Sequence, residues 1–275
     1  MSDLLSGQQK AHNQKGLDIQ GLSILEIAIV LVIIGMLVGA VVAGLGVVRA
    51  SEYRTILKEA EGYQSAVRMF QGKYSALPGD MPNATDYWGA ATCPSTAGTG
   101  TQTCNGDGDS FIETTLLAGS YTEMFMFWQH LSIAGLIPGE YTGRSGTTGG
   151  GGAGYDHTVG VNHPASDVAH ASWWVFNQNI SGAGGGVAFR IDYGNFLQIG
   201  ARTNTVIPNT PFLKPDDAWS VDSKADDGKP GTGRIIARDY NNCATGAASN
   251  TDVQNASYNI SSGLITCSLH FIKVF

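Results

Sequence analysis

The sequence predicts an α+β fold, in which one long N-terminal α-helix packs on a head of antiparallel β-strands and long loops. Three observations support this prediction: residues 21–48 are almost wholly apolar, residues 56–74 carry apolar side chains at helical spacing, and several later segments alternate between apolar and polar residues. Charged residues make up only 14 % of the 275 residues, and 37 residues are glycine. This composition is more typical of a secreted or surface protein than of a cytosolic enzyme.

The apolar segment reads "GLSILEIAIVLVIIGMLVGAVVAGLGVV" and extends from Gly21 to Val48. It contains no charged residue from Ile27 onward, and a helix of this length spans the bilayer core of about 30 Å. The apolar core of a secretory signal peptide is shorter, about 7–15 residues. We therefore expect a membrane-spanning helix.

One carboxylate, Glu26, lies near the start of this segment. A charge costs about 2.5–3.5 kcal/mol at the centre of a bilayer and less near its edge, so Glu26 is expected to have a cationic partner. No Lys or Arg lies between Lys15 and Arg49. Cleavage after Gly21 would, however, create an α-amino group at Leu22, in the same chain or in a neighbouring one.

Gly21, residues 22–25, Glu26 and the long apolar run together resemble the N-terminal signature of type IV pilins and type II secretion pseudopilins. The resemblance implies cleavage between Gly21 and Leu22 by a prepilin peptidase, and methylation of the new N-terminus at Leu22. It also implies that Glu26 pairs with the N-terminal amine of a neighbouring subunit. Leu22 and Ala43 depart from the common pattern, which has Phe and Pro at these places. The alternative is a plain signal anchor with an isolated Glu.

The same resemblance divides the chain into four parts. Residues 1–21 are a polar leader, whose two lysines keep it cytoplasmic by the positive-inside rule. Residues 22–48 are the membrane-spanning and assembly half of the N-terminal helix, and residues 49–75 are its amphipathic half. Residues 76–275 form the globular head, so that the whole has the family's lollipop fold.

The amphipathic half is supported by its own periodicity. Apolar side chains recur every three or four residues and form one helical stripe: Ile56, Ala60, Tyr63, Val67, Phe70 and Tyr74. The two prolines and the glycine of "SALPGDMPN" then end the helix. One helix is therefore expected from about Leu22 to about Tyr74.

The head shows shorter patterns. "GVAFRIDYGNFLQIGAR" predicts a β-hairpin with Gly194-Asn195 as its turn, and "LITCSLHFIKVF" predicts a C-terminal strand. Residues 122–135 have helical spacing. "ASWWVFNQ", with Trp173 and Trp174, is more typical of a core segment than of a sugar-binding platform.

The four cysteines are Cys93, Cys104, Cys243 and Cys267. They allow three pairings, and nearest-neighbour pairing would close the loops 93–104 and 243–267. Disulfides require an oxidising compartment; the alternative is four free buried thiols. The absence of a CxxC spacing gives little support to a zinc site. The 243–267 loop resembles the disulfide-bounded C-terminal region of many pilins.

The segment "CNGDGDSFIE" resembles the first part of an EF-hand-type calcium loop. Its candidate ligands for Ca²⁺ are Asn105, Asp107, Asp109 and Glu113. The bidentate Glu expected at the twelfth position is replaced by Leu116, so another carboxylate would have to complete the shell. The alternative is a cluster of Asx-turns in a solvated loop.

Two further groups of polar residues are weaker candidates. The segment "PDDAWSVDSKADDGKPGTG" is interpreted as an acidic loop, and its acidic residues are Asp216, Asp217, Asp222, Asp226 and Asp227. Major pseudopilins carry calcium in a late loop of the head. The spacing of the acidic residues here, however, matches no calcium template. His157, His163 and His170 are six and seven residues apart, which suits no standard metal site.

The resemblance implies a structural subunit that polymerises with other pilin-like subunits, with the prepilin peptidase and an inner-membrane assembly platform as partners. The expected product is an extracellular pilus for adhesion, motility or DNA uptake, and the alternative is the periplasmic pseudopilus of type II secretion. Before assembly the subunit would lie in the inner membrane. A membrane-anchored enzyme or binding domain is a distant alternative, because no GxSxG or HExxH motif occurs. The net charge of −7 argues against nucleic-acid binding by the monomer.

Overall fold

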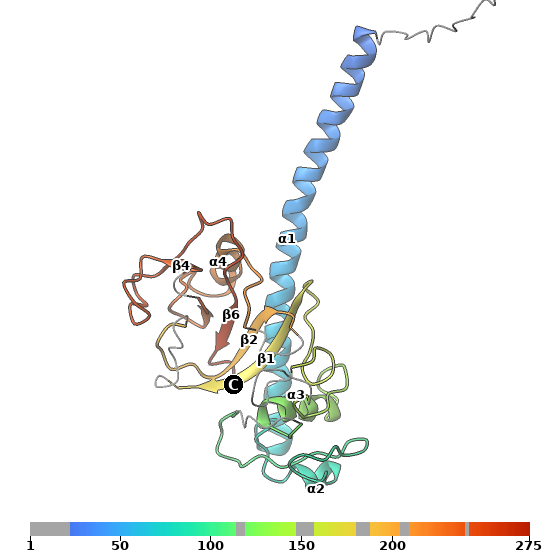
Figure 1. The fold of residues 1–275 in the computed structure, drawn as a ribbon, viewed down its shortest axis with the longest axis vertical. Helices are drawn as coiled ribbons and strands as arrows, with labels where there is room; N and C mark the ends of the chain where they lie inside the picture. Colours follow the sequence, from blue (N-terminus) through green and yellow to red (C-terminus); the bar gives the residue numbers. More distant parts are fainter. Residues whose placement is uncertain (1–22, 114–118, 147–156, 180–187, 204–208, 240–241) are drawn as a thin grey trace, which may run out of the picture. The chain divides into compact units, whose positions relative to one another are not determined.

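The computed structural model describes residues 23–113, 119–146, 157–179, 188–203, 209–239 and 242–275. Figure 1 shows their helices and strands along the chain. The chain divides into two units, Met1–Val48 and Arg49–Phe275, and each is described by itself. This division falls where the sequence changes from wholly apolar to amphipathic.

Helix α1 extends without interruption from Ile24 to Tyr74, which confirms the long N-terminal helix for the described residues. It ends where Ser75 adopts a positive φ of 54°, a conformation that L-residues rarely continue as a helix. The helix is therefore stopped at Ser75, the first residue of the predicted stop segment, before either of its prolines is reached. Leu77 and Met81 of that stop segment are buried in the core of the head.

The second half of α1, which belongs to the unit from Arg49 onward, forms the centre of the head's core. The predicted stripe is confirmed, because Ile56, Val67 and Phe70 are fully buried. Tyr63 makes edge-to-face contacts with Trp128 and Trp173, at ring-centre distances of 5.0 and 5.7 Å. Aromatic pairs of this geometry add to the free energy gained from burial.

Four antiparallel strands form the main sheet in the order β1-β2-β6-β3. Their bounds are Ala171–Gln178 for β1, Gly194–Ala201 for β2, Ile235–Ala237 for β3 and Leu269–Ile272 for β6. The last of these confirms the predicted C-terminal strand. Alternate side chains of each strand point to opposite faces, so the sheet presents two faces to be covered.

One face packs against α1 and against α3, which runs from Glu123 to Ile133 and confirms the predicted second helix. Trp173, Leu197 and Phe271 belong to this face. Trp173 and Trp174 are both buried, as expected of a core segment. The other face carries a second apolar cluster, formed with irregular segments of the head.

The predicted hairpin is wrong in its first arm. Residues 188–193 form no strand, and Gly194-Asn195 is the start of β2 and not a turn. The partner of β2 is β1, with Gln178 opposite Gly194. The alternation in residues 188–193 instead reflects burial of Phe189 and Tyr193 in the second cluster, while the backbone N–H of Arg190 donates to Asn250.

The second acidic segment is also not simply a loop, because its first part is helix α4, Pro215–Ala225. Pro215 begins the helix, and Asp216 and Asp217 lie in its first turn, where negative charge is favourable. Ala218 and Val221 bury its inner side. The remaining short elements are α2, Ala84–Trp88, and the paired strands β4, Ala244–Thr245, and β5, Ser257–Tyr258.

Candidate functional site

Glu26 lies in the first turn of α1, next to the two processing residues predicted from the sequence. Gly21 and Leu22 lie outside the described residues. The backbone N–H of Ser23 donates to Glu26 Oε2 at 2.8 Å, and the backbone N–H of Glu26 donates to Ser23 Oγ at 3.2 Å. This reciprocal pair is a capping box, which the spacing Ser-x-x-Glu could have predicted. The carboxylate is therefore held at the N-terminal end of the helix.

The segment Ile24–Val48 exposes its apolar side chains. Large side chains such as Leu31, Met36 and Val41 are more than half exposed within the structure. Among the described residues this is the one helix long and apolar enough to cross a membrane, by length and composition. Such a helix fits a membrane anchor or a signal sequence, and it needs either lipid or other protein to cover it.

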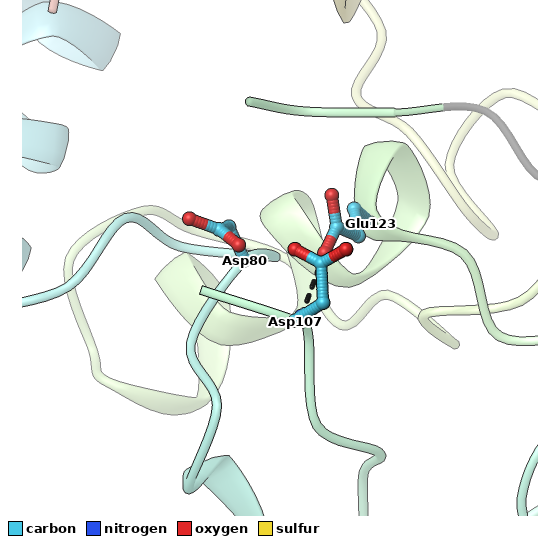
Figure 2. A group of neighbouring side chains, drawn as sticks. All are labelled: Asp80, Asp107 and Glu123. Atoms are coloured by element: carbon cyan, nitrogen blue, oxygen red, sulfur yellow. Dashed lines mark hydrogen bonds between the residues drawn. The ribbon is translucent and has the colours of Figure 1, made fainter. Parts of the chain in front are cut away.

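A second candidate site lies in the head, where several carboxylates come together (Figure 2). Asp80, Asp107 and Glu123 form one group whose oxygen atoms lie within 4.8 Å of one another. Asp107 also belongs to a second such group with Asp109 and Glu113. Three of these five residues were candidates from the sequence. Asp80 and Glu123 were missed, because they come from the helix-stop segment and from the start of α3.

Asp80 fixes the conformation of the acidic loop. Its Oδ1 accepts hydrogen bonds from the backbone N–H groups of Gly108 at 2.6 Å and Asp109 at 3.1 Å. Its Oδ2 accepts one from Ser110 at 2.9 Å. Burial nevertheless raises the pKa of the Asp80 carboxyl, since loss of hydration outweighs these bonds.

Glu123 fixes the loop from the other side. Its Oε1 accepts from the backbone N–H of Asp107 at 3.2 Å, and its Oε2 from that of Glu113 at 3.1 Å. Burial raises the pKa of Glu123 to about 8, and the neighbouring Asp80 and Glu113 charges add to this effect. The cluster therefore gathers carboxyl groups at a partly buried position, where they repel one another when they are ionised.

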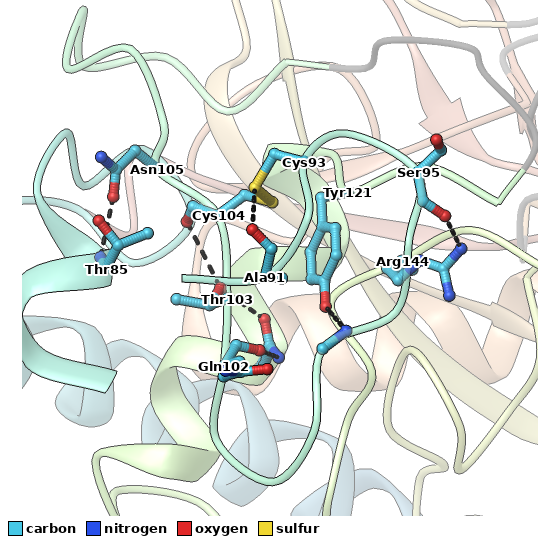
Figure 3. The surroundings of a disulfide bond; sticks show 12 residues. Thr85, Ala91, Cys93, Ser95, Gln102, Thr103, Cys104, Asn105, Tyr121 and Arg144 are labelled. Carbon is cyan, nitrogen blue, oxygen red and sulfur yellow. Dashed lines mark hydrogen bonds between the residues drawn. A yellow bond between two sulfur atoms is a disulfide. The ribbon is translucent and has the colours of Figure 1, made fainter. Parts of the chain in front are cut away.

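The remaining predicted ligand, Asn105, makes a hydrogen bond outside the carboxylate cluster. Its Oδ1 accepts a hydrogen bond from the backbone N–H of Thr85 at 2.9 Å (Figure 3). Asp107 and Asp109 each accept from the backbone N–H two residues later, the bond of an Asx-turn. The loop thus combines the features of both sequence-based interpretations: Asx-turns and a gathering of carboxylates.

A third acidic group lies at the end of α4 and contains Asp222, Asp226 and Asp227. Asp222 is buried and accepts hydrogen bonds from the Tyr258 hydroxyl at 2.8 Å and from the Gly228 backbone at 3.1 Å. Burial raises its pKa to about 7. Asp226 accepts from the backbone N–H groups of Arg234 and Ile235, so this group holds the following loop in place.

Both predicted disulfides are present. Cys93 bonds to Cys104 and Cys243 to Cys267, with Cα–Cα distances of 5.9 and 5.0 Å. The first closes a loop beside the acidic cluster, and Figure 3 shows the hydrogen bonds that surround it. One of these runs from the backbone N–H of Gly98 to the Tyr121 hydroxyl, at 3.0 Å.

The three histidines singled out by spacing separate into a pair and a single residue. His157 and His163 are fully buried, and their ring centres lie 5.2 Å apart. His170 is exposed.

Comparisons of the chain with family models, with curated proteins and with solved structures found no match.

Proposed function

We propose that this protein is a structural subunit of a type IV pilus-like filament, which polymerises through residues 22–48. The observation that carries the proposal is the continuous helix α1, whose first half exposes large apolar side chains and carries one carboxylate at its start. Before assembly, lipid would cover this surface in the inner membrane. After assembly, the same half of neighbouring subunits would cover it.

Glu26 is the residue that sets the register in this proposal. Cleavage between Gly21 and Leu22 would leave an amine close to the N-terminal end of α1. The capping box with Ser23 already holds the Glu26 carboxylate at that end. In a surrounding of low dielectric constant, each unpaired amine would strongly favour a position beside a carboxylate of the next subunit.

Gly35 and Gly39 support close packing between such helices. They are four residues apart, in the spacing that lets two helices approach closely within a membrane. A Cβ at either position would have no neighbour within 4 Å in the structure, so neither glycine is required by the fold described here. Their use is therefore expected in contacts between subunits.

We further propose that the acidic cluster binds Ca²⁺ through Asp80, Asp107, Asp109, Glu113 and Glu123. Carboxylate oxygens are the ligands that Ca²⁺ prefers, and an extracellular site of about 10⁻⁴–10⁻³ M affinity would be occupied. Calcium binding by the head would favour the alternative function, a pseudopilin of type II secretion. In either case the proposed role is structural and not enzymatic.

The experiment that tests the proposed function is intact-mass analysis of the protein from its native cell. Loss of residues 1–21 with addition of one methyl group at Leu22 is the expected result. An intact N-terminus would leave Glu26 without an amine, and the protein would then be a plain membrane-anchored domain. Isolation of sheared surface fibres, or of periplasmic assemblies, distinguishes the pilus from the pseudopilus.

A further inference from the structure

The buried pair His157 and His163 has an unusual set of polar contacts. Among the described residues, neither ring nitrogen of His157 has a hydrogen-bond partner, and neither does Nε2 of His163. Both side chains are fully buried. A neutral imidazole carries one N–H donor and one acceptor, and leaving these unpaired in a protein interior is costly. The pair therefore needs an explanation beyond packing.

Hydrogen bonding fixes the tautomer of His163. Its Nδ1 lies 3.0 Å from Asn162 Oδ1. That oxygen is an acceptor, because it also receives the backbone N–H of Thr158 at 2.8 Å, while Asn162 Nδ2 donates to the carbonyl of Arg144 at 3.0 Å. His163 Nδ1 must therefore carry the proton, and Nε2 presents a lone pair. Histidines that ligate metals show this arrangement, in which one nitrogen donates to a fixed carbonyl and the other binds the ion.

The surroundings of the pair are aromatic and polar without being acidic. Phe125 and Trp174 lie beside His157, at ring-centre distances of 4.9 and 5.9 Å. Ser172 Oγ and Trp174 Nε1, on the same face of β1, are also buried without a partner in the described part of the chain. No His, Cys, Asp or Glu of the described residues joins the two histidines in a group of three ligand atoms within 4.8 Å.

We propose that His157 and His163 bind one monovalent soft metal ion, Cu(I), between their unpaired nitrogens. A metal–nitrogen distance of about 2.0 Å puts each ring centre about 3 Å from the ion, so two rings on one ion have centres no more than about 6 Å apart. The observed 5.2 Å satisfies this limit. The site is independent of the proposed assembly through α1.

The charge of the surroundings selects the ion. A divalent ion such as Zn²⁺ would keep its full charge in this buried place, because two neutral imidazoles and the Ser172 hydroxyl neutralise none of it. Cu(I) carries half the charge of Zn²⁺ and forms complexes with a low coordination number. The four cysteines, which would otherwise attract Cu(I), are all in disulfides.

The test uses the full chain in detergent, with its disulfides intact and without oxygen. The protein is equilibrated overnight with Cu(I) and a chromophoric Cu(I) chelator, because ions reach a buried site slowly. We expect one equivalent to bind, and at least a 100-fold weaker affinity in His157→Asn and His163→Asn. The matched control His170→Asn changes an exposed histidine and should retain the wild-type affinity.

A second measurement does not depend on the folding of variants. Ag(I), which is a redox-inert analogue of Cu(I), is added to the wild-type protein, and the side-chain ¹⁵N resonances of its histidines are recorded. We expect large shifts of His163 Nε2 and of one nitrogen of His157. Unchanged resonances at both residues would overturn the proposal, and so would equal Cu(I) affinity in all three variants. Tighter binding of Zn²⁺ than of Cu(I) would overturn the choice of ion.

Discussion

Trp173 of β1 donates its indole N–H to Glu59 Oε2 of α1 at 2.7 Å, although the two residues are 114 positions apart. The same carboxylate accepts from Ser166 Oγ and from the backbone N–H of Asp167, each at 2.6 Å. Trp173 is fully buried. Glu59 therefore connects the second half of the long helix to the strand that begins the sheet.

Replacing Glu59 tests this connection. We expect Glu59→Ala to lower the free energy of unfolding of the head by about 2–4 kcal/mol, because it leaves several donors without an acceptor. Glu59→Gln should lose less, since its amide oxygen still accepts. Chemical denaturation followed by Trp fluorescence measures the difference. Glu61→Ala, at an exposed position on the same helix, should change stability by less than about 0.5 kcal/mol.

Glu26→Gln tests the proposed assembly. The substitution keeps a side chain able to form the capping box and removes the charge, so the helix should persist. We expect the yield of filaments recovered from cells to fall at least tenfold, with unchanged cleavage after Gly21. Glu52→Gln, further along α1, should assemble normally. Normal assembly of Glu26→Gln would contradict a register set by charge.

Gly39→Leu tests close packing of the assembly helices. A larger side chain should reduce filament yield severalfold without changing the stability of the head, because nothing in the structure lies within 4 Å of a Cβ at this position. Val41→Leu is the matched control, at an exposed apolar position on another side of the helix. Equal yields of the two variants would show that Gly39 is not in a contact between subunits.

Calcium should act through Glu123. In calcium-free buffer, a carboxyl with a folded pKa of about 8 binds a proton that the unfolded chain releases near pH 4.5. Its contribution to stability is therefore present at low pH and is lost as the pH rises toward 8. Millimolar Ca²⁺ should replace the proton and raise the melting temperature most at pH 8.

Variants of the cluster check the calcium prediction. Glu113→Gln changes an exposed member and should weaken the calcium-induced shift in melting temperature. Asp86→Asn changes an exposed carboxylate of α2 and should leave the shift intact. A shift of the same size in both variants, or none in the wild-type protein at pH 8, would remove Ca²⁺ from the proposed function.

Acid should destabilise the head through its buried histidines. Burial lowers the pKa of His130, His163 and His270 to about 3, and that of His157 well below its usual value. The unfolded chain takes up these protons near pH 6.5, so stability falls as the pH drops from about 6.5 toward 3. Each histidine contributes up to about 1.4 kcal/mol per pH unit.

The buried carboxyls Glu123 and Asp222 oppose the histidines, since their raised pKa values favour the folded state at lower pH. The raised pKa values of Asp80 and Glu113 act in the same direction as those of Glu123 and Asp222. Because the pKa values of the four histidines are lowered strongly, we expect the histidines to outweigh these carboxyls, with maximal stability in calcium-free buffer near pH 6.5 and a decline on both sides. Denaturation midpoints between pH 4 and 9 measure this. His170→Asn should not alter the acid limb, because that side chain is exposed. A midpoint that rises steadily below pH 6 would contradict the prediction.

Local sequence patterns correctly predicted the helices and strands in which apolar side chains recur at a single regular spacing. The stripe from Ile56 to Tyr74 predicted the second half of α1, and alternation near Leu269 predicted β6. These predictions succeed because periodicity depends only on the geometry of the helix or strand and on which side is buried. The disulfide pairing could also be predicted from the sequence, since short loops favour pairing of neighbouring cysteines.

Alternation failed where burial arose from tertiary contacts without a strand. Phe189 and Tyr193 alternate with polar residues, but the Phe189 carbonyl accepts from Ile191 within the same segment, and the Tyr193 N–H reaches β1 at its last residue, Gln178. The segment at Pro215 looked like a loop because its charges dominate the composition. Its helix is apparent once Val221 is seen to be buried.

By itself the sequence determined the apolar segment, its single carboxylate Glu26 and the length of the N-terminal helix, because these depend on residues adjacent along the chain. Only the tertiary structure decided which distant groups meet. Asp80 joined Glu123 across the acidic loop, and His163 joined His157 in the interior. Contacts of this kind depend on how the whole chain closes around its core, and no local spacing records them.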